Sequence, residues 1–161
     1  MKIFRILTVI ITVSLMGFIF YMSAQNATES SGTSQKVIVF VLKIFMRNFE
    51  SISEIEKAEL ISSLQFIVRK SAHFSVYALL GAFSYLSMAT YKSIPFYLRS
   101  GIGAMICLVY AISDEIHQYF VPGRSCEIRD VCIDFCGALL AVILLSVVAK
   151  YSKVKIIINN I

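Results

Sequence analysis

The 161-residue chain has few charged residues, no tryptophan and only two prolines. Charged side chains make up 16% of it, whereas hydrophobic residues make up 58%. A soluble domain carries about 25% charged residues, so this composition excludes an ordinary soluble protein. The four cysteines include no CxxC pair, which leaves no pattern typical of a disulfide framework or a thiolate metal site. The scarcity of charge indicates a chain that lies largely in lipid.

Long apolar runs also indicate a membrane protein. Four of them approach or exceed the roughly 18–20 residues that a bilayer-spanning helix needs. They cover residues 3–22, 72–90, 100–120 and 131–149. We therefore expect an all-α polytopic membrane protein with four transmembrane helices, forming a single domain over residues 1–161.

The region between the first two runs has a mixed character. Residues 23–35 are rich in Ser, Thr, Asn and Gly, so we expect a solvated connection there. Residues 36–49 predict a short amphipathic helix with one basic stripe of Lys36, Lys43 and Arg47. Such a helix is typical of the membrane interface, although a short helix packed on the bundle fits equally well.

The second apolar run has a polar extension at its start. Ser53 and Glu56 have the spacing of a capping box, in which the two side chains satisfy backbone N–H groups at the beginning of a helix. We expect a helix that begins here and continues into the second span without a break.

A net charge of +5 can indicate a protein that binds nucleic acid. In this chain, however, the basic residues flank the predicted spans. They are Lys2, Arg5, Lys92, Arg99, Lys150, Lys153 and Lys155. With an even number of spans these regions share one side of the membrane, and the positive-inside rule makes that side cytoplasmic. We expect a multi-pass protein of the cytoplasmic membrane with both termini in the cytoplasm, and no nucleic-acid partner.

Ionisable residues concentrate in residues 113–130, directly after the apolar run from Gly101 to Ile112. An ionisable side chain in hydrocarbon is costly unless it is paired, hydrated or turned toward a protein interior. Similar residues lie at the start of the second and fourth spans. We expect a site at the outer ends of the last three spans, formed by Lys70, His73, Tyr77, Asp114, Glu115, His117, Gln118, Arg124, Asp130 and Asp134.

Three of these residues fall at one depth. With a rise of about 1.5 Å per residue, His73, Asp114 and Asp134 lie roughly 22–29 Å from the inner boundary of a hydrocarbon core about 30 Å thick. Helical spacing also places Lys70, His73 and Tyr77 close to one stripe of the second span. The sequence predicts that these groups meet in one cavity that opens outward.

Several uses fit such a cluster. Lys70 or Arg124 paired with an aspartate of the fourth span would brace the helices, but a brace needs only two or three charges. Imidazoles and carboxylates are metal ligands, yet no HExxH or DxD spacing is present, and we expect neither a metal nor another cofactor. Acid–base chemistry is also open, with His117 beside Asp114 as an oriented base.

Four motifs bear a family likeness. Arg69 to Gly81 matches the pattern Arg-Lys-x-x-His-Phe-x-x-Tyr-x-x-Leu-Gly. Residues 113–124 contain Ser-Asp-Glu-x-x-Gln followed by Pro-Gly-Arg, and residues 130–137 read Asp-x-x-x-Asp-x-x-Gly. Residues 20–25 are similar to Phe-Tyr-x-Ser-Ser-Gln, with Ala in place of the second Ser. Through these motifs the chain resembles the VanZ-like membrane proteins, small four-helix proteins of mainly Gram-positive bacteria.

The founding member of that family is associated with low-level resistance to the glycopeptide teicoplanin, so the resemblance implies a role in the cell envelope. Our first hypothesis is a protein whose outer-leaflet polar pocket binds or shields an amphiphile. The expected partners are a membrane lipid head group, a lipid-linked cell-wall precursor or a lipoglycopeptide. The alternative is a membrane-embedded hydrolase or transferase, acid–base or metal-assisted, that acts on a lipid-linked substrate.

Overall fold

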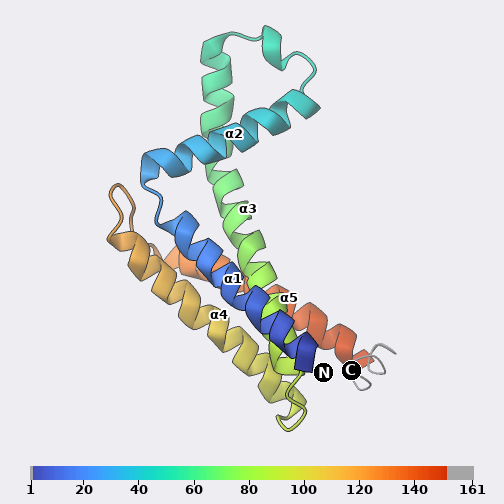
Figure 1. Ribbon diagram of the computed structural model, residues 1–161. Helices are drawn as coiled ribbons and strands as arrows, with labels where there is room; N and C mark the ends of the chain where they lie inside the picture. Colours follow the sequence, from blue (N-terminus) through green and yellow to red (C-terminus); the bar gives the residue numbers. More distant parts are fainter. Residues whose placement is uncertain (1, 152–161) are drawn as a thin grey trace.

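The computed structural model describes residues 2–151. Over this range the chain is all-helical, as predicted, with five α-helices, one short 3-10 turn and no strand. Four helices are long and apolar enough to cross a membrane: α1 (Lys2–Ser23), α3 (Glu54–Ala89), α4 (Phe96–Tyr119) and α5 (Ile128–Tyr151). They pack into a bundle, and α2 (Ala27–Phe45) crosses over α3 (Figure 1).

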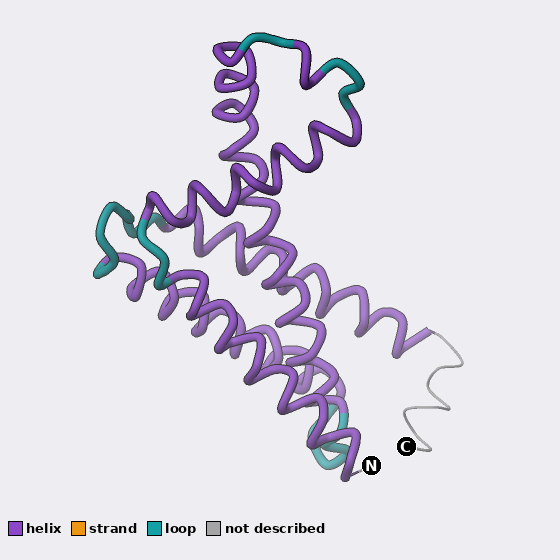
Figure 2. Tube along the Cα trace, turned by 45° about the horizontal axis from the view of Figure 1, so that its top comes forward, coloured by secondary structure: helices purple, strands orange, loops and turns teal. Residues whose placement is uncertain are grey.

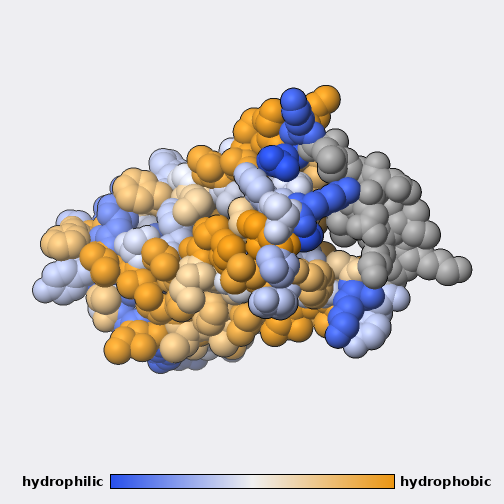
Figure 3. All heavy atoms as spheres, turned by 90° about the horizontal axis from the view of Figure 1, so that it is seen from below, coloured by the Kyte–Doolittle hydropathy of each residue, from blue (hydrophilic) through white to orange (hydrophobic). Residues whose placement is uncertain are grey.

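The start of α1 and the end of α5 lie at the same end of the bundle, together with the α3–α4 connection (Figure 1). The Nε of Arg5 donates a 3.1 Å hydrogen bond to Oγ1 of Thr90, which ties the start of α1 to that connection. The described residues that flank the spans on this end are Lys2, Arg5, Lys92, Arg99 and Lys150. Lys153 and Lys155 lie outside the described residues. Seen from below, apolar residues cover much of the bundle surface (Figure 3).

Residues 23–35, predicted as a solvated connection, are helical for most of their length, because α2 already begins at Ala27. The Oδ1 of Asn26 accepts a 2.9 Å hydrogen bond from the backbone N–H of Glu29. The carboxylate of Glu29 accepts a 3.2 Å bond from the backbone N–H of Asn26 in return. This capping box satisfies two backbone donors, so a Ser- and Thr-rich sequence is held as helix.

The predicted helix of residues 36–49 is also too long at its end. Since α2 stops at Phe45, Arg47 lies beyond it, and the basic stripe of this helix consists of Lys36 and Lys43 alone. A short 3-10 turn, η1 (Phe49–Ser51), then leads toward α3.

The predicted capping box at Ser53 is confirmed, and α3 runs on from it for 36 residues without interruption. At about 1.5 Å per residue this helix is about 54 Å long, well beyond a hydrocarbon core of about 30 Å. Its first part projects from the bundle with α2 and η1 (Figure 2). We call this projecting unit, residues 27–65, the arm. Within it, Nε2 of Gln65 donates a 3.1 Å hydrogen bond to the backbone oxygen of Ser31.

The tightest helix contact joins α3 to α5. A Cβ added at Gly137 would collide with the backbone of Phe74, and one added at Gly81 would collide with the backbone of Ala138. Small residues let transmembrane helices approach this closely, and dispersion contacts then hold them. The contacts advance along both helices in the same direction, so α3 and α5 run parallel.

We predict that Gly137→Ala destabilises the bundle, because the new methyl group meets backbone atoms that cannot turn away. The expected loss is about 1–3 kcal/mol in the free energy of unfolding, measured by SDS titration in mixed micelles. Gly17→Ala is the matched control, since nothing lies within 4 Å of its added Cβ. That control should be neutral or more stable by up to about 1 kcal/mol. Equal behaviour of the two variants would contradict the close approach of α3 and α5.

Candidate functional site

Asp114 on α4 is almost completely buried, with 3% of its surface exposed. Its Oδ2 accepts a 2.9 Å hydrogen bond from the hydroxyl of Ser23, at the end of α1. The side-chain amide of Gln118, one turn further along α4, donates a second bond of 3.3 Å to the same oxygen. Lipid offers no hydrogen bonds, so this carboxylate depends on donors from within the bundle.

Two contacts between predicted site residues connect α3 to α5. The ammonium group of Lys70 binds both carboxylate oxygens of Asp130, and both side chains are about one-fifth exposed. One turn deeper, Nδ1 of His73 lies 3.5 Å from Oδ2 of Asp134. A carboxylate at this place orients an imidazole, which is the arrangement found around a general base.

Tyr77 lies one turn further along α3 than His73, and both line the same face of the helix toward α1. The side chain of Tyr77 is fully buried. One carboxylate oxygen each of Asp114 and Asp134 and the tyrosine hydroxyl are buried without a hydrogen-bond partner among the described residues. The structure thus brings His73, Tyr77, Asp114 and Asp134 together from three helices.

Two other predicted residues are placed differently. The ring of His117 stacks on Phe20, with 4.3 Å between ring centroids, and its Nε2 is buried without a hydrogen-bond partner. The partners of Asp114 are Ser23 and Gln118, so His117 does not form the oriented base expected beside it. Glu115 is buried and accepts a 2.7 Å hydrogen bond from the backbone N–H of Glu127, which fixes the α4–α5 connection.

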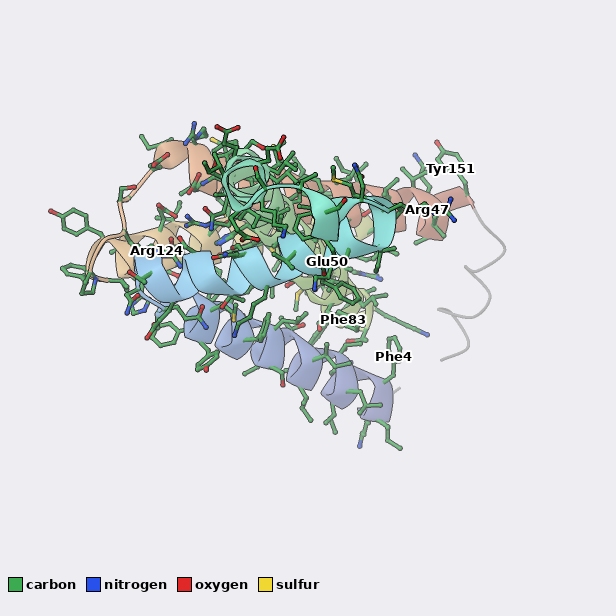
Figure 4. The ribbon with its side chains drawn as sticks, turned by 90° about the horizontal axis from the view of Figure 1, so that it is seen from above. Phe4, Arg47, Glu50, Phe83, Arg124 and Tyr151 are labelled. Carbon is green, nitrogen blue, oxygen red and sulfur yellow. The ribbon has the colours of Figure 1, made fainter. Side chains whose placement is uncertain are left out.

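A polar cavity of about 190 Å³ opens above this cluster, at the end of the bundle where α4 joins α5. Figure 4 shows Arg124 at this end, opposite to Phe4 and Tyr151. The charged side chains that line the cavity are Arg69, Lys70, Arg124, Glu127, Arg129 and Asp130. Four of these six are basic, so the cavity carries a surplus of positive charge.

Arg124 is held in the cavity by neutral partners. Its Nε donates a 3.2 Å hydrogen bond to the backbone oxygen of Gln25, and its Nη1 donates one of 3.4 Å to the side chain of Gln118. Burial lowers the pKa of the Arg124 guanidinium, and the positive charge of Arg69 lowers it further. Three carboxylates raise this pKa, those of Asp114, Glu115 and Asp130. The first two effects favour an anion placed between the two arginine side chains.

Among residues 2–151, no group of three or more His, Cys, Asp or Glu side chains is arranged to hold a metal ion. Cys126, Cys132 and Cys136 are exposed, whereas Cys107 is buried.

Two residues of the site are missing from the sequence prediction. Ser23 provides a donor to Asp114, and Arg69 lines the cavity beside Arg124. The signal for both was present, since Ser23 belongs to the motif of residues 20–25 and Arg69 opens the motif that ends at Gly81. Neither residue follows from helical spacing, because each one's role depends on how a different helix packs against it.

A family model described as VanZ/LLP1 matches residues 8–149. The chain belongs to the VanZ/LLP1 family. This match includes most of every spanning helix and confirms the likeness to VanZ-like proteins. Together with the four apolar helices it identifies the VanZ/LLP1 chain as a membrane protein. Searches of curated proteins and of solved structures found no match.

We predict that Ser23→Ala destabilises this VanZ/LLP1 protein by about 1–3 kcal/mol, because a buried carboxylate loses its nearest hydrogen-bond donor. Unfolding by SDS titration measures the change. Ser14→Ala, an identical substitution at an exposed position of the same helix, is the control and should have little effect. In the background of Asp114→Asn the effect of Ser23→Ala should shrink. An undiminished effect would show that the hydroxyl acts through some other group.

Proposed function

We propose that this protein binds the anionic head group of an amphiphile in the cavity of about 190 Å³. The observation that carries the proposal is the pairing of charges in its lining. Lys70 is paired with Asp130, and Arg129 lies 2.7 Å from Glu127. Within the part of the chain that the structure describes, Arg69 and Arg124 have no carboxylate partner.

Two guanidinium groups without carboxylates are suited to an anion that can bridge them. A guanidinium presents several N–H donors in one plane, which matches the oxygens of a phosphate or carboxylate better than an ammonium group does. The cavity is partly shielded from solvent, so the attraction is weakened less by water and salt than on an open surface. Repulsion between the two arginines adds to the gain on binding, because an anion removes it.

The position of the cavity along the membrane normal favours an amphiphile over a soluble ion as the ligand. It lies at the opposite end of the bundle from the basic residues around the termini (Figure 4). In the topology proposed from the positive-inside rule, that end faces the outer leaflet of the cytoplasmic membrane, where head groups lie. A lipid head group, a lipid-linked cell-wall precursor and a lipoglycopeptide are the ligands that we propose for it.

The variant Arg69→Gln tests the proposal directly, because Arg69 makes no hydrogen bond to any of residues 2–151 that its loss would break. We expect binding of an anionic lipid such as phosphatidic acid to weaken about tenfold, which corresponds to one charge-assisted contact. Native mass spectrometry of the protein released from nanodiscs measures the bound fraction. The double variant with Arg124→Gln should weaken binding further.

Lys43→Gln, which removes the same charge from the arm, is the control and should leave binding unchanged. Binding that falls equally in the arm variant and in the cavity variants would reveal a general attraction to anionic lipid. That result, or full binding by the double cavity variant, would contradict a head-group site at Arg69 and Arg124.

A proposed action on lipoglycopeptides predicts a difference between two drugs. Teicoplanin carries an acyl chain and vancomycin does not, so expression of the protein should lower sensitivity to teicoplanin more than to vancomycin. Minimum inhibitory concentrations in one host strain, with and without expression, measure this. Loss of the effect with Arg69→Gln would support a role of the cavity, whereas an equal change for both drugs would argue against a lipid-level mechanism.

A further inference from the structure

A second hollow lies beside the polar cavity, between α1 and α3. It has a volume of about 150 Å³, and its lining is almost entirely apolar. The lining includes Phe18 and Met22 of α1 and Ala72 and Val76 of α3. This apolar cleft is open toward the lipid-facing side of the two helices, since Phe18 is half exposed.

The cleft and the cavity are neighbours in the structure, although no residue lines both of them. Lys70 lines the cavity and His73 lines the cleft, and the two residues lie one turn apart on α3. Similarly, Nε2 of Gln118, which lines the cavity, contacts the hydroxyl of Ser23, which lines the cleft, at 3.4 Å. The apolar cleft thus begins one helical turn along α3 from the charged part of the cavity.

We propose that the ligand is a phosphate-bearing lipid, with its phosphate between Arg69 and Arg124 and one hydrocarbon chain in the cleft of α1 and α3. This inference rests on the proposed function and gives the ligand a chemical class. A phosphate monoester carries a charge close to −2, which matches the two guanidinium groups that lack carboxylates. The apolar lining excludes a second polar group from the position beneath it.

A hydrocarbon chain that moves from the bilayer into the cleft stays in an apolar environment, so the move gains no hydrophobic free energy. We expect the cleft to fix where the bound chain lies rather than to strengthen binding. Its effect is therefore visible in where a bound chain lies. A phosphatidic acid with a photoactivatable diazirine midway along one chain serves as the probe, in nanodiscs of phosphatidylcholine. Phosphatidylcholine with the same diazirine is the reference for ordinary lipid contact.

We expect the phosphatidic acid probe to label peptides of α1 and α3 around Phe18, Met22, Ala72 and Val76, several-fold above the reference probe. Ala72→Phe, which fills the cleft, should remove this excess. Ser75→Phe adds nearly the same bulk at an exposed position of α3 outside the cleft and should leave the excess intact. Glycerol phosphate, which lacks chains, should compete with the lipid far less well than dihexanoyl phosphatidic acid does.

Failure of this inference differs from failure of the proposed function. If labelling spreads as it does with the reference probe while Arg69→Gln still weakens phosphatidic acid binding, the chain lies in bulk lipid and the cleft proposal is overturned. Equal competition by glycerol phosphate would likewise overturn it and favour a soluble phosphate. If substitution of both arginines leaves phosphatidic acid binding unchanged, the head-group site is refuted. The proposed position of the chain in the cleft is then refuted as well.

Discussion

Two carboxylates inside a helix bundle that lies in lipid govern the arrangement of the helices around them. Asp114 and Asp134 are 3% and 2% exposed, and hydrocarbon supplies neither water nor hydrogen-bond donors. Each carboxylate therefore requires a partner from another helix at its own depth. Ser23, the last residue of α1, donates a hydrogen bond to Asp114, and His73 of α3 lies beside Asp134. The convergence of the helix ends is a direct consequence of this requirement.

The glycines of the α3–α5 contact make these pairings possible. Because Gly137 lies against the backbone of Phe74, the two helices are close enough for side chains one turn away to meet. The ion pair of Lys70 and Asp130, the contact of His73 and Asp134 and the glycine contact follow one another along the same parallel register. A slip of one helix would break all of them at once, so packing and polar pairing specify the same arrangement.

Much of this fold could be predicted from the sequence, since hydrophobicity and length alone identify spanning helices. The capping box at Ser53 and the polar stripe of α3 also follow from local spacing. The helix of residues 27–35 was missed because its composition is that of a loop, and its stability depends on the local cap at Asn26.

The candidate site was predictable in part. Spacing gives the face of a helix but not the neighbour that this face meets. His117 shares a face with Asp114 by spacing, yet it stacks on Phe20 of α1. Arg69 becomes a cavity residue only because the α4–α5 connection brings Arg124 over it. Contacts between distant segments depend on tertiary packing, which no local pattern encodes.

The unbroken helix α3 belongs to both the arm and the bundle. No proline or glycine interrupts the helix between Glu54 and Leu80, so nothing along this stretch acts as a hinge. The arm stands on the first part of this helix, and Arg69 and Lys70 stand on its middle. Because one continuous helix carries both, the direction in which the arm projects and the positions of Arg69 and Lys70 are set by the same helix axis.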